Sequence, residues 1–166
     1  MPDLLAHYAT SYLVASRLAN SRKEALLVAF FGLVPDLDIF FHAHRYISHS
    51  IFLPIAFLLV ALMQRSPGWR RLLLTLSLLY ALHLTLDIFT APLPLFAPLS
   101  STAYMVHLGI VGRVGLEPSI RWNASVETVE LAHGMTVSEG PIASATGAIV
   151  LVAVLFYELA DRLKKG

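Results

Sequence analysis

The sequence contains no cysteine, and charged residues make up only 14% of its 166 positions. The absence of cysteine excludes disulfide bonds and thiolate metal ligands. The shortage of charge excludes an ordinary soluble composition, in which about 25% of residues are charged. Hydrophobic residues instead make up 57% of the chain, and the mean hydropathy is +0.69. Because the net charge is only +1, no nucleic-acid partner is expected.

Apolar residues recur in segments along most of the chain. The segments lie at residues 4–18, 25–41, 51–63, 72–89 and 142–159. A helix that crosses a bilayer needs roughly 20 residues, with about 17 as a lower limit. The second, fourth and fifth segments reach that limit, the third reaches it only if its helix starts near Ser48, and the first either spans or lies in the interface. We therefore expect a single all-α membrane domain over residues 1–166, built as a bundle of four to five transmembrane helices.

Basic residues gather at alternate ends of these segments. The groups are Arg17, Arg22 and Lys23, then Arg65, Arg70 and Arg71, and finally Arg162, Lys164 and Lys165. Basic loops mark the cytoplasmic side of a membrane protein. The distribution therefore predicts a multi-pass protein of the cell membrane whose C-terminus is cytoplasmic and whose N-terminus lies outside.

The composition changes after the fourth apolar segment. Pro92, Pro94 and Pro98 interrupt any regular helix there. Polar and apolar residues then alternate in parts of 104–114 and 119–131, a pattern that favours short strands joined by glycine-containing turns. We expect a small β-like extracytoplasmic insertion over residues 100–141.

Histidine and aspartate residues gather at the ends that the basic residues place outside. They are His7, Asp36, Asp38, His49, His83 and Asp87. His83 and Asp87 are spaced i, i+4, so that both side chains lie on one helical face. A set of imidazoles and carboxylates without thiolates suits zinc, with manganese or iron as alternatives. We predict that these six residues bind a divalent metal.

Each of these residues also has a structural alternative. His83 alone could be a hydrogen-bonded core histidine, and the two aspartates after Pro35 could simply end a helix at the interface. His42 and His44 could be surface residues, and Arg45 is either an interface anchor or a group that binds an anionic substrate. In the catalytic interpretation, Asp38 or Asp36 takes a proton from a metal-activated water while Arg45 holds the substrate.

Four motifs carry a resemblance to a known family. They are Pro2-Asp3-Leu4-Leu5-Ala6-His7, Pro35-Asp36-Leu37-Asp38, His44-Arg45-Tyr46-Ile47-Ser48-His49-Ser50 and His83-Leu84-Thr85-Leu86-Asp87. Together they resemble the LexA-binding, inner-membrane-associated hydrolase family, whose members are described as membrane-bound metal-dependent hydrolases. That family commonly has threonine where this chain has Ser48. The resemblance covers about residues 1–100.

The family is in turn distantly similar to zinc-dependent phospholipase C and P1 nuclease. This similarity implies that a metal is held by His49, by His83 and by Asp36 or Asp38. Asp87 would bridge two ions, with His7 on the second. A later His-x-x-x-Glu motif of those enzymes is absent here, which puts a three-metal cluster in doubt.

The sequence thus predicts a membrane-bound metal-dependent hydrolase that acts on a phosphoester or phospholipid at the outer face of the membrane. A transporter or ion-pathway protein would also place Asp and His in apolar helices, but it would spread them over the full depth. A non-enzymatic membrane adaptor, as the LexA-binding label suggests, leaves the His and Asp residues unexplained. Both alternatives stay open on the sequence alone.

Overall fold

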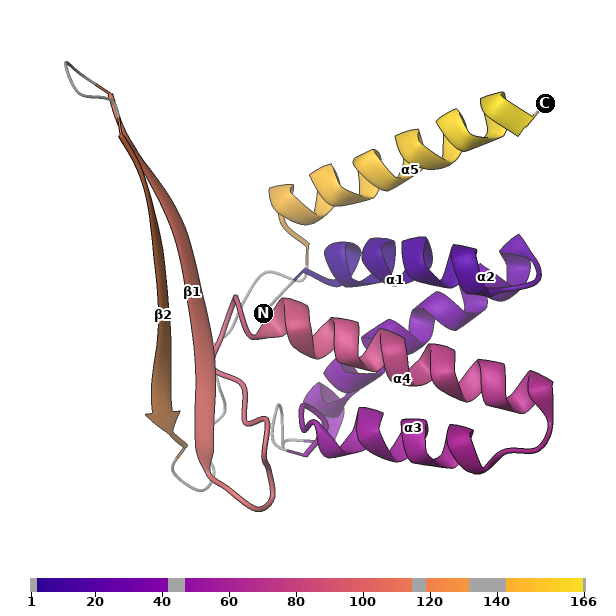
Figure 1. Ribbon diagram of the computed structural model, residues 1–166, viewed down its shortest axis with the longest axis horizontal. Helices are drawn as coiled ribbons and strands as arrows, with labels where there is room; N and C mark the ends of the chain where they lie inside the picture. The colour runs from indigo at the N-terminus through magenta and orange to yellow at the C-terminus, as the bar shows by residue number, and fades with distance from the viewer. Residues whose placement is uncertain (1–2, 42–46, 115–118, 132–142, 166) are drawn as a thin grey trace.

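The computed structural model describes residues 3–41, 47–114, 119–131 and 143–165. Its helices are α1 (Leu4–Leu18), α2 (Arg22–Ala29), the 3₁₀ helix η1 (Phe30–Phe41), α3 (Phe52–Met63), α4 (Pro67–Asp87) and α5 (Ala145–Lys165), and its strands are β1 (Thr102–Arg113) and β2 (Ser119–Glu130). The helices form one body, and the two strands form a ribbon at one end of it (Figure 1).

Asp3 fixes the starts of two helices at once. One carboxylate oxygen accepts a hydrogen bond from the backbone N–H of Leu5 at 2.8 Å, which caps α1. The other oxygen accepts the backbone N–H of Ser144, just before α5. A methyl group on Gly147 would overlap this carboxylate. The absence of a side chain there lets α1 and α5 run side by side (Figure 1).

The second helix begins with a Ser-x-x-Glu capping pattern. Ser21 accepts the backbone N–H of Glu24 at 3.2 Å, and the Glu24 side chain accepts that of Asn20 at 2.8 Å. After α2 the chain continues as η1, a 12-residue 3₁₀ stretch that contains Pro35. Proline lacks the N–H that an α-helix interior needs, and 3₁₀ runs of this length are uncommon and often mark functional sites.

Small residues let the central helices approach closely. Ala15 of α1, Ala25 and Ala29 of α2 and Leu79 of α4 form one buried cluster. The pair α3 and α4 forms a helical hairpin in which the Ser77 hydroxyl donates to the Pro54 carbonyl at 2.8 Å. These contacts hold α4, which carries two of the predicted metal ligands, against the other helices.

The ribbon has a regular antiparallel register. It runs from Thr102 paired with Glu130 to Arg113 paired with Ser119. Its base is joined to the helical body by backbone bonds between Leu93 and Tyr104 and by the Val106 N–H donating to the Ile88 carbonyl at 2.8 Å. Both strands lie inside the predicted insertion at 100–141, of which 115–118 and 132–141 fall outside the described residues. The division of the chain into domains stays a prediction.

The expected all-α bundle of four to five transmembrane helices is wrong. The fold is mixed, with helices and a two-stranded antiparallel sheet. Over the described ranges, no helix combines the length and the apolar character needed to cross a membrane. The apolar run at 25–41 is divided between α2, with 8 residues, and η1, and the run at 51–63 gives only the 12 residues of α3. Large apolar side chains remain exposed, among them Met63 at 82% and Phe156 at 68%.

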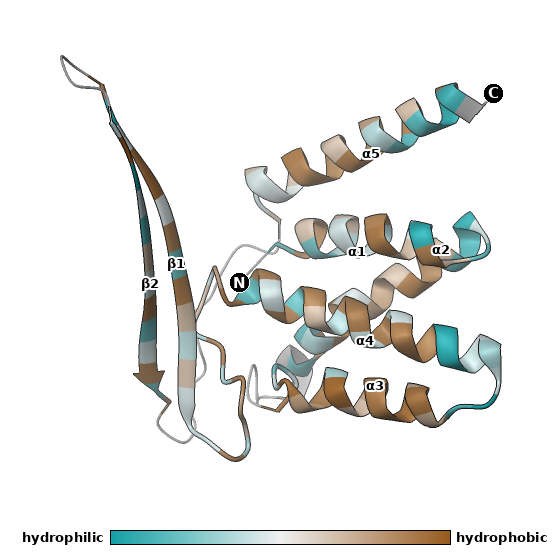
Figure 2. Cartoon of the chain, in the orientation of Figure 1, coloured by the Kyte–Doolittle hydropathy of each residue, from teal (hydrophilic) through white to brown (hydrophobic). Residues whose placement is uncertain are grey.

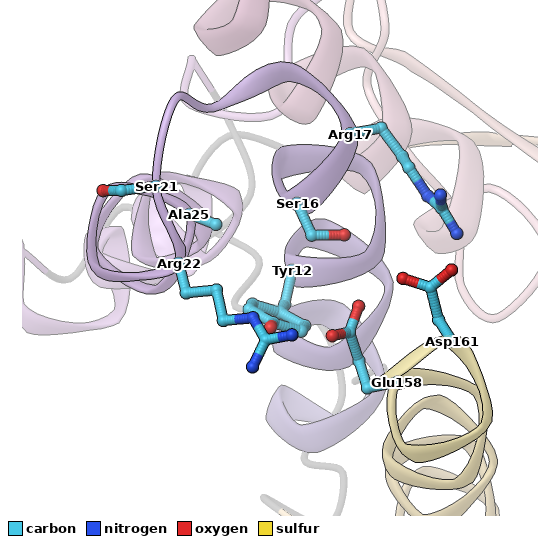
Figure 3. A pocket seen from close by; sticks show the side chains of 8 residues that line it. All are labelled: Tyr12, Ser16, Arg17, Ser21, Arg22, Ala25, Glu158 and Asp161. Atoms are coloured by element: carbon cyan, nitrogen blue, oxygen red, sulfur yellow. The ribbon is translucent and has the colours of Figure 1, made fainter. Parts of the chain in front are cut away.

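The three groups of basic residues noted in the sequence belong to turns and helix ends at the side of the helical body away from the ribbon. The α1–α2 turn, the α3–α4 turn and the end of α5 all lie there (Figure 1). A polar cavity of about 130 Å³ at this end is lined by Tyr12, Ser16, Arg17, Ser21, Arg22, Ala25, Glu158 and Asp161 (Figure 3). In this cavity Arg17 of α1 and Arg22 of α2 face the acidic side chains of α5 (Figure 3). The cavity therefore lies between three helices and carries charges of both signs.

Candidate metal centre

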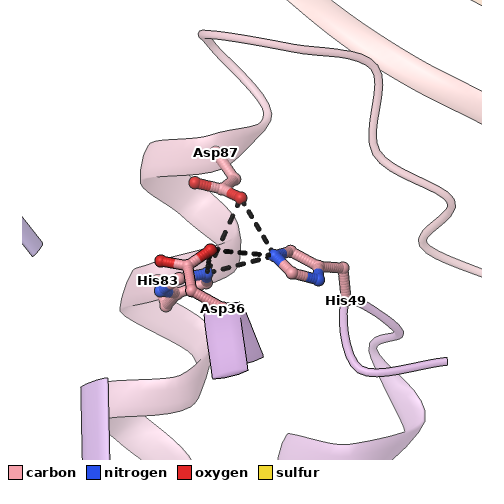
Figure 4. A group of neighbouring side chains, drawn as sticks. All are labelled: Asp36, His49, His83 and Asp87. Carbon is pink, nitrogen blue, oxygen red and sulfur yellow. Dashed lines mark hydrogen bonds and ion pairs between the residues drawn. The ribbon is translucent and has the colours of Figure 1, made fainter. Parts of the chain in front are cut away.

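Two histidines and two aspartates from three parts of the chain meet in the interior. Asp36 comes from η1, His49 precedes α3, and His83 with Asp87 comes from the last two turns of α4 (Figure 4). One ligand atom from each residue lies within 4.8 Å of the other three. All four side chains are buried, with exposed fractions of 5% or less. These four residues are called the metal group below.

Five of the six separations between the ligand atoms are close to those of a tetrahedral shell. The Nε2 atoms of His49 and His83 lie 3.3 Å apart, and Oδ2 of Asp87 lies 3.2 and 3.6 Å from them. Oδ1 of Asp36 lies 3.6 Å from His49 Nε2 and 3.7 Å from His83 Nε2. Zinc ligands at about 2.0–2.2 Å from the ion lie about 3.3–3.6 Å from one another in a tetrahedron. The four residues can therefore hold one ion with little rearrangement.

The carbonyl oxygen of Gly32 fixes the tautomer of His83. It lies 2.8 Å from Nδ1 of that imidazole and, as a carbonyl, can only accept the ring proton. The lone pair of Nε2 is thereby left facing the metal group, which is the second-shell arrangement of metal-binding histidines. Gly32 approaches Ser11 of α1 so closely that a methyl group on it would overlap the Ser11 side chain.

Asp38 lies behind His49 and not among the four ligand atoms. Its Oδ2 is 3.6 Å from Nδ1 of His49 and accepts the hydroxyl of Ser48, which itself lies 3.0 Å from the same Nδ1. A carboxylate on the far nitrogen of a ligating imidazole orients the ring and raises its basicity. The predicted ligand Asp38 is thus placed as a positioning residue.

Replacing Asp36 or Asp38 by asparagine should distinguish a metal ligand from a residue that orients a ligand. Asp38→Asn keeps a hydrogen-bond acceptor near His49 and is expected to weaken metal binding about 10–100-fold. Asp36→Asn removes a charged ligand and is expected to weaken binding by a larger factor. Competition titrations against a chromogenic chelator would measure both affinities. An equal loss in the two variants would contradict the assignment of Asp38 to the second shell.

His7 contacts the metal group through Oδ1 of Asp87. Its Nε2 lies 3.1 Å from Oδ1 of Asp87, and its ring stacks on His83 with centroids 4.2 Å apart. Asp87 therefore directs one oxygen to the metal group and the other to His7. This is the placement that a carboxylate bridging two ions requires, although His7 is not one of the four clustered ligands.

In the metal-free protein, the pKa values of His49 and His83 are shifted in opposite directions. Burial lowers the pKa of His49, but Asp36, Asp38 and Asp87 outweigh it and raise the pKa to about 10. Burial, followed by the neighbouring His7, lowers the pKa of His83 to about 4. At neutral pH, therefore, His49 is an imidazolium surrounded by carboxylates and His83 is neutral.

These pKa values predict how metal binding depends on pH. The raised pKa of His49 stabilises the metal-free fold fully below pH 6.5, and this contribution is lost as the pH rises through about 10. A metal must displace the His49 proton, so binding near neutral pH should release about one proton and strengthen as the pH rises. Calorimetry in buffers of different ionisation enthalpy measures the released protons. Binding without proton release would contradict a protonated His49.

Sequence reasoning missed the residues that support the metal group. Ser48 was noted as a possible helix start and as a departure from the family motif, Tyr80 was interpreted as helix packing or an interface anchor, and neither Ser11 nor Gly32 was given a role at the site. The Tyr80 hydroxyl donates to the Ser48 carbonyl and anchors the segment that carries His49. Arg45, the predicted substrate-binding residue, lies outside the described residues, as do His42 and His44.

A comparison with known families covers nearly the whole chain. A family model described as YdjM inner membrane protein matches residues 3–164, which include every residue of the metal group. No curated protein and no solved structure matches the chain. The match agrees with the expected inner-membrane-associated family and carries no information on LexA binding or on a likeness to phospholipase C.

Proposed function

We propose that this chain, which belongs to the YdjM inner membrane protein family, is a metal-dependent hydrolase that cleaves a phosphoester bond. The observation that carries the proposal is the buried metal group, with His83 oriented by Gly32 and His49 oriented by Asp38. Second-shell partners on both imidazoles favour an ion-binding centre over two isolated core histidines.

The residues present fit a divalent cation. Two carboxylates buried within one small group are costly unless a cation compensates their charge. Both oxygens of Asp36 are buried and have no hydrogen-bond donor within the described ranges. The set of two imidazoles and two carboxylates suits zinc, with manganese or iron as alternatives. A bound ion would lower the pKa of a water toward about 7 and polarise a phosphoryl oxygen.

The residues of the metal group would have different roles in the reaction. His49, His83 and Asp87 hold fixed positions, because each of them has a partner outside the metal group: Asp38, Gly32 and His7, respectively. Asp36 directs one oxygen to the metal group, and its second oxygen is available to take a proton from a water. Asp38, the base predicted from sequence, is already engaged by Ser48 and His49. Asp36 is therefore the better candidate for the base.

The substrate we propose is the phosphoester of a membrane lipid, with the metal group toward the outer face of the membrane. The family is named for an inner membrane protein, and apolar side chains of α3 and α5 are exposed. The outward placement rests on the distribution of basic residues, which the fold collects at the end opposite the ribbon. Arg45 remains the predicted anion-binding residue.

Hydrolysis assays on the metal-loaded full chain test this function. The wild type should cleave bis(p-nitrophenyl) phosphate, Asp87→Asn should not, and the exposed substitution Thr85→Val on the same helix should leave the rate unchanged. A parallel assay with phosphatidylglycerol vesicles tests the lipid substrate by the release of phosphorylated products. If metal-saturated wild-type protein cleaves neither substrate, the hydrolase proposal is wrong even if the metal binds.

A further inference from the structure

The ribbon of β1 and β2 has one face that is almost entirely apolar. Successive side chains of a strand point to opposite faces, and the register places like faces opposite each other. Beyond Thr102 and Glu130 at the base of the ribbon, this face consists of Tyr104, Val106, Leu108, Ile110 and Gly112 on β1, with Ile120, Trp122, Ala124, Val126 and Thr128 on β2. Glu130, at the base, is the one charged residue of the face within the two strands. The alternation of hydrophobic and polar residues is visible along both strands (Figure 2).

The far part of this face is open to solvent. Trp122 is 80% exposed, Ile120 73%, Leu108 67% and Ile110 62%. Among the described residues, backbone hydrogen bonds join the ribbon to the rest of the chain at its base, through Leu93 and Ile88. An isolated two-stranded hairpin is marginally stable in water, and exposed apolar faces mark interaction sites. The ribbon therefore has the character of a docking element.

The opposite face of the ribbon is mostly polar. His107 and Glu127 form an exposed ion pair at 2.9 Å, and Asn123 and Ser125 lie beside it. Toward the far end this face carries Arg113, paired with Ser119, and Arg121, paired with the apolar Val111. The ribbon is thus amphipathic, with cations near the end at which its apolar face is most exposed.

The size of the apolar face argues against a second copy of the chain as its partner. Eight residue steps of strand span about 27 Å, and two strands with their side chains cover a width of about 10 Å, giving about 300 Å². A stable protein interface buries about 800 Å² on each partner. A bilayer has no such minimum, since each apolar side chain that enters it contributes independently.

We propose that the far part of the ribbon, Leu108–Arg113 with Ser119–Ala124, lies on a lipid bilayer with its apolar face inserted at the headgroup boundary. Tryptophan favours that boundary because its ring is apolar and its N–H remains hydrogen-bonded. Arg113 and Arg121 can extend to anionic headgroups while their stems stay on the ribbon. The chain belongs to a family named for an inner membrane protein, which supports a bilayer as the partner of this face. The proposal is independent of the metal group and of hydrolysis.

The two tryptophans of the chain make a direct test possible. In the full chain with Trp69→Phe, Trp122 is the single tryptophan, and excitation at the red edge of the absorption band avoids the tyrosines. A matched variant with Trp69→Phe, Trp122→Phe and Asn123→Trp places the fluorophore one residue along, on the opposite face. Both are reconstituted in vesicles of phosphatidylcholine and phosphatidylglycerol, with and without lipids brominated near the glycerol end of their acyl chains. Both positions are exposed, so neither change should disturb the fold.

Brominated lipid should quench Trp122 several-fold more strongly than the tryptophan at position 123, and emission from Trp122 should shift to shorter wavelength. Equal and weak quenching at both positions would overturn the proposal. A blue-shifted Trp122 that bromine does not quench, and that shifts back on dilution of the protein in lipid, would assign the face to a second copy instead. Circular dichroism of both variants verifies that the ribbon is retained.

Discussion

Asp87→Asn is expected to abolish stoichiometric metal binding by the purified protein. Oδ2 of Asp87 lies 3.2 Å from the ligand nitrogen of His49 and 3.6 Å from that of His83, while Oδ1 lies 3.1 Å from His7. Asparagine preserves the volume of the side chain but replaces one oxygen by an NH₂ group, which cannot ligate and carries no charge. The change therefore removes half of the carboxylate charge of the metal group, and the one remaining oxygen can serve the metal or His7 but not both.

Metal content after dialysis against trace zinc, measured by mass spectrometry, checks this expectation. The matched control is Thr85→Val, on the same helix, whose exposed hydroxyl bonds only to the Ala81 carbonyl. Zinc at 100 times its dissociation constant should raise the free energy of unfolding by about 2.7 kcal/mol in the wild type and in the control, but not in Asp87→Asn. Wild-type metal content in Asp87→Asn would contradict the assignment of Asp87 as a metal ligand.

Gly32→Ala is expected to cause a large loss of stability. The new methyl would overlap both the Oγ and the Cβ of Ser11, which is 1% exposed and held within α1. Overpacking of this kind costs about 1–3 kcal/mol, and sometimes more. Since the Gly32 carbonyl also accepts from His83, the displacement should weaken metal binding as well.

Two further variants separate overpacking from a general glycine effect. Ser11→Gly combined with Gly32→Ala removes the side chain that the new methyl would overlap, and it should recover much of the lost stability. Gly68→Ala, where a new methyl would meet no atom within 4 Å, should be neutral or stabilising by up to about 1 kcal/mol. Unfolding by denaturant, followed by circular dichroism, compares the four proteins. A Gly32→Ala protein as stable as the wild type would refute the close contact of η1 with α1.

The sequence by itself determined the chemistry of the metal group. With no cysteine, any tightly held metal must use imidazole and carboxylate ligands, and the i, i+4 spacing of His83 and Asp87 places both on one helical face whatever the rest of the chain does. Alternation over 119–131 likewise indicated a strand, because a period of two residues is a local property. These inferences depend on the backbone of a single element.

Only the tertiary structure decided how the apolar segments are used and which aspartate faces the ligands. A run of apolar residues indicates that the side chains avoid water, but it does not indicate where an α-helix gives way to a 3₁₀ helix. The division of residues 25–41 between α2 and η1 was therefore missed. Asp36 and Asp38 are identical in type and two residues apart. The winding of η1 turns the first toward Nε2 of His49 and the second toward Nδ1. That assignment requires the position of a histidine on another element, which no local pattern contains.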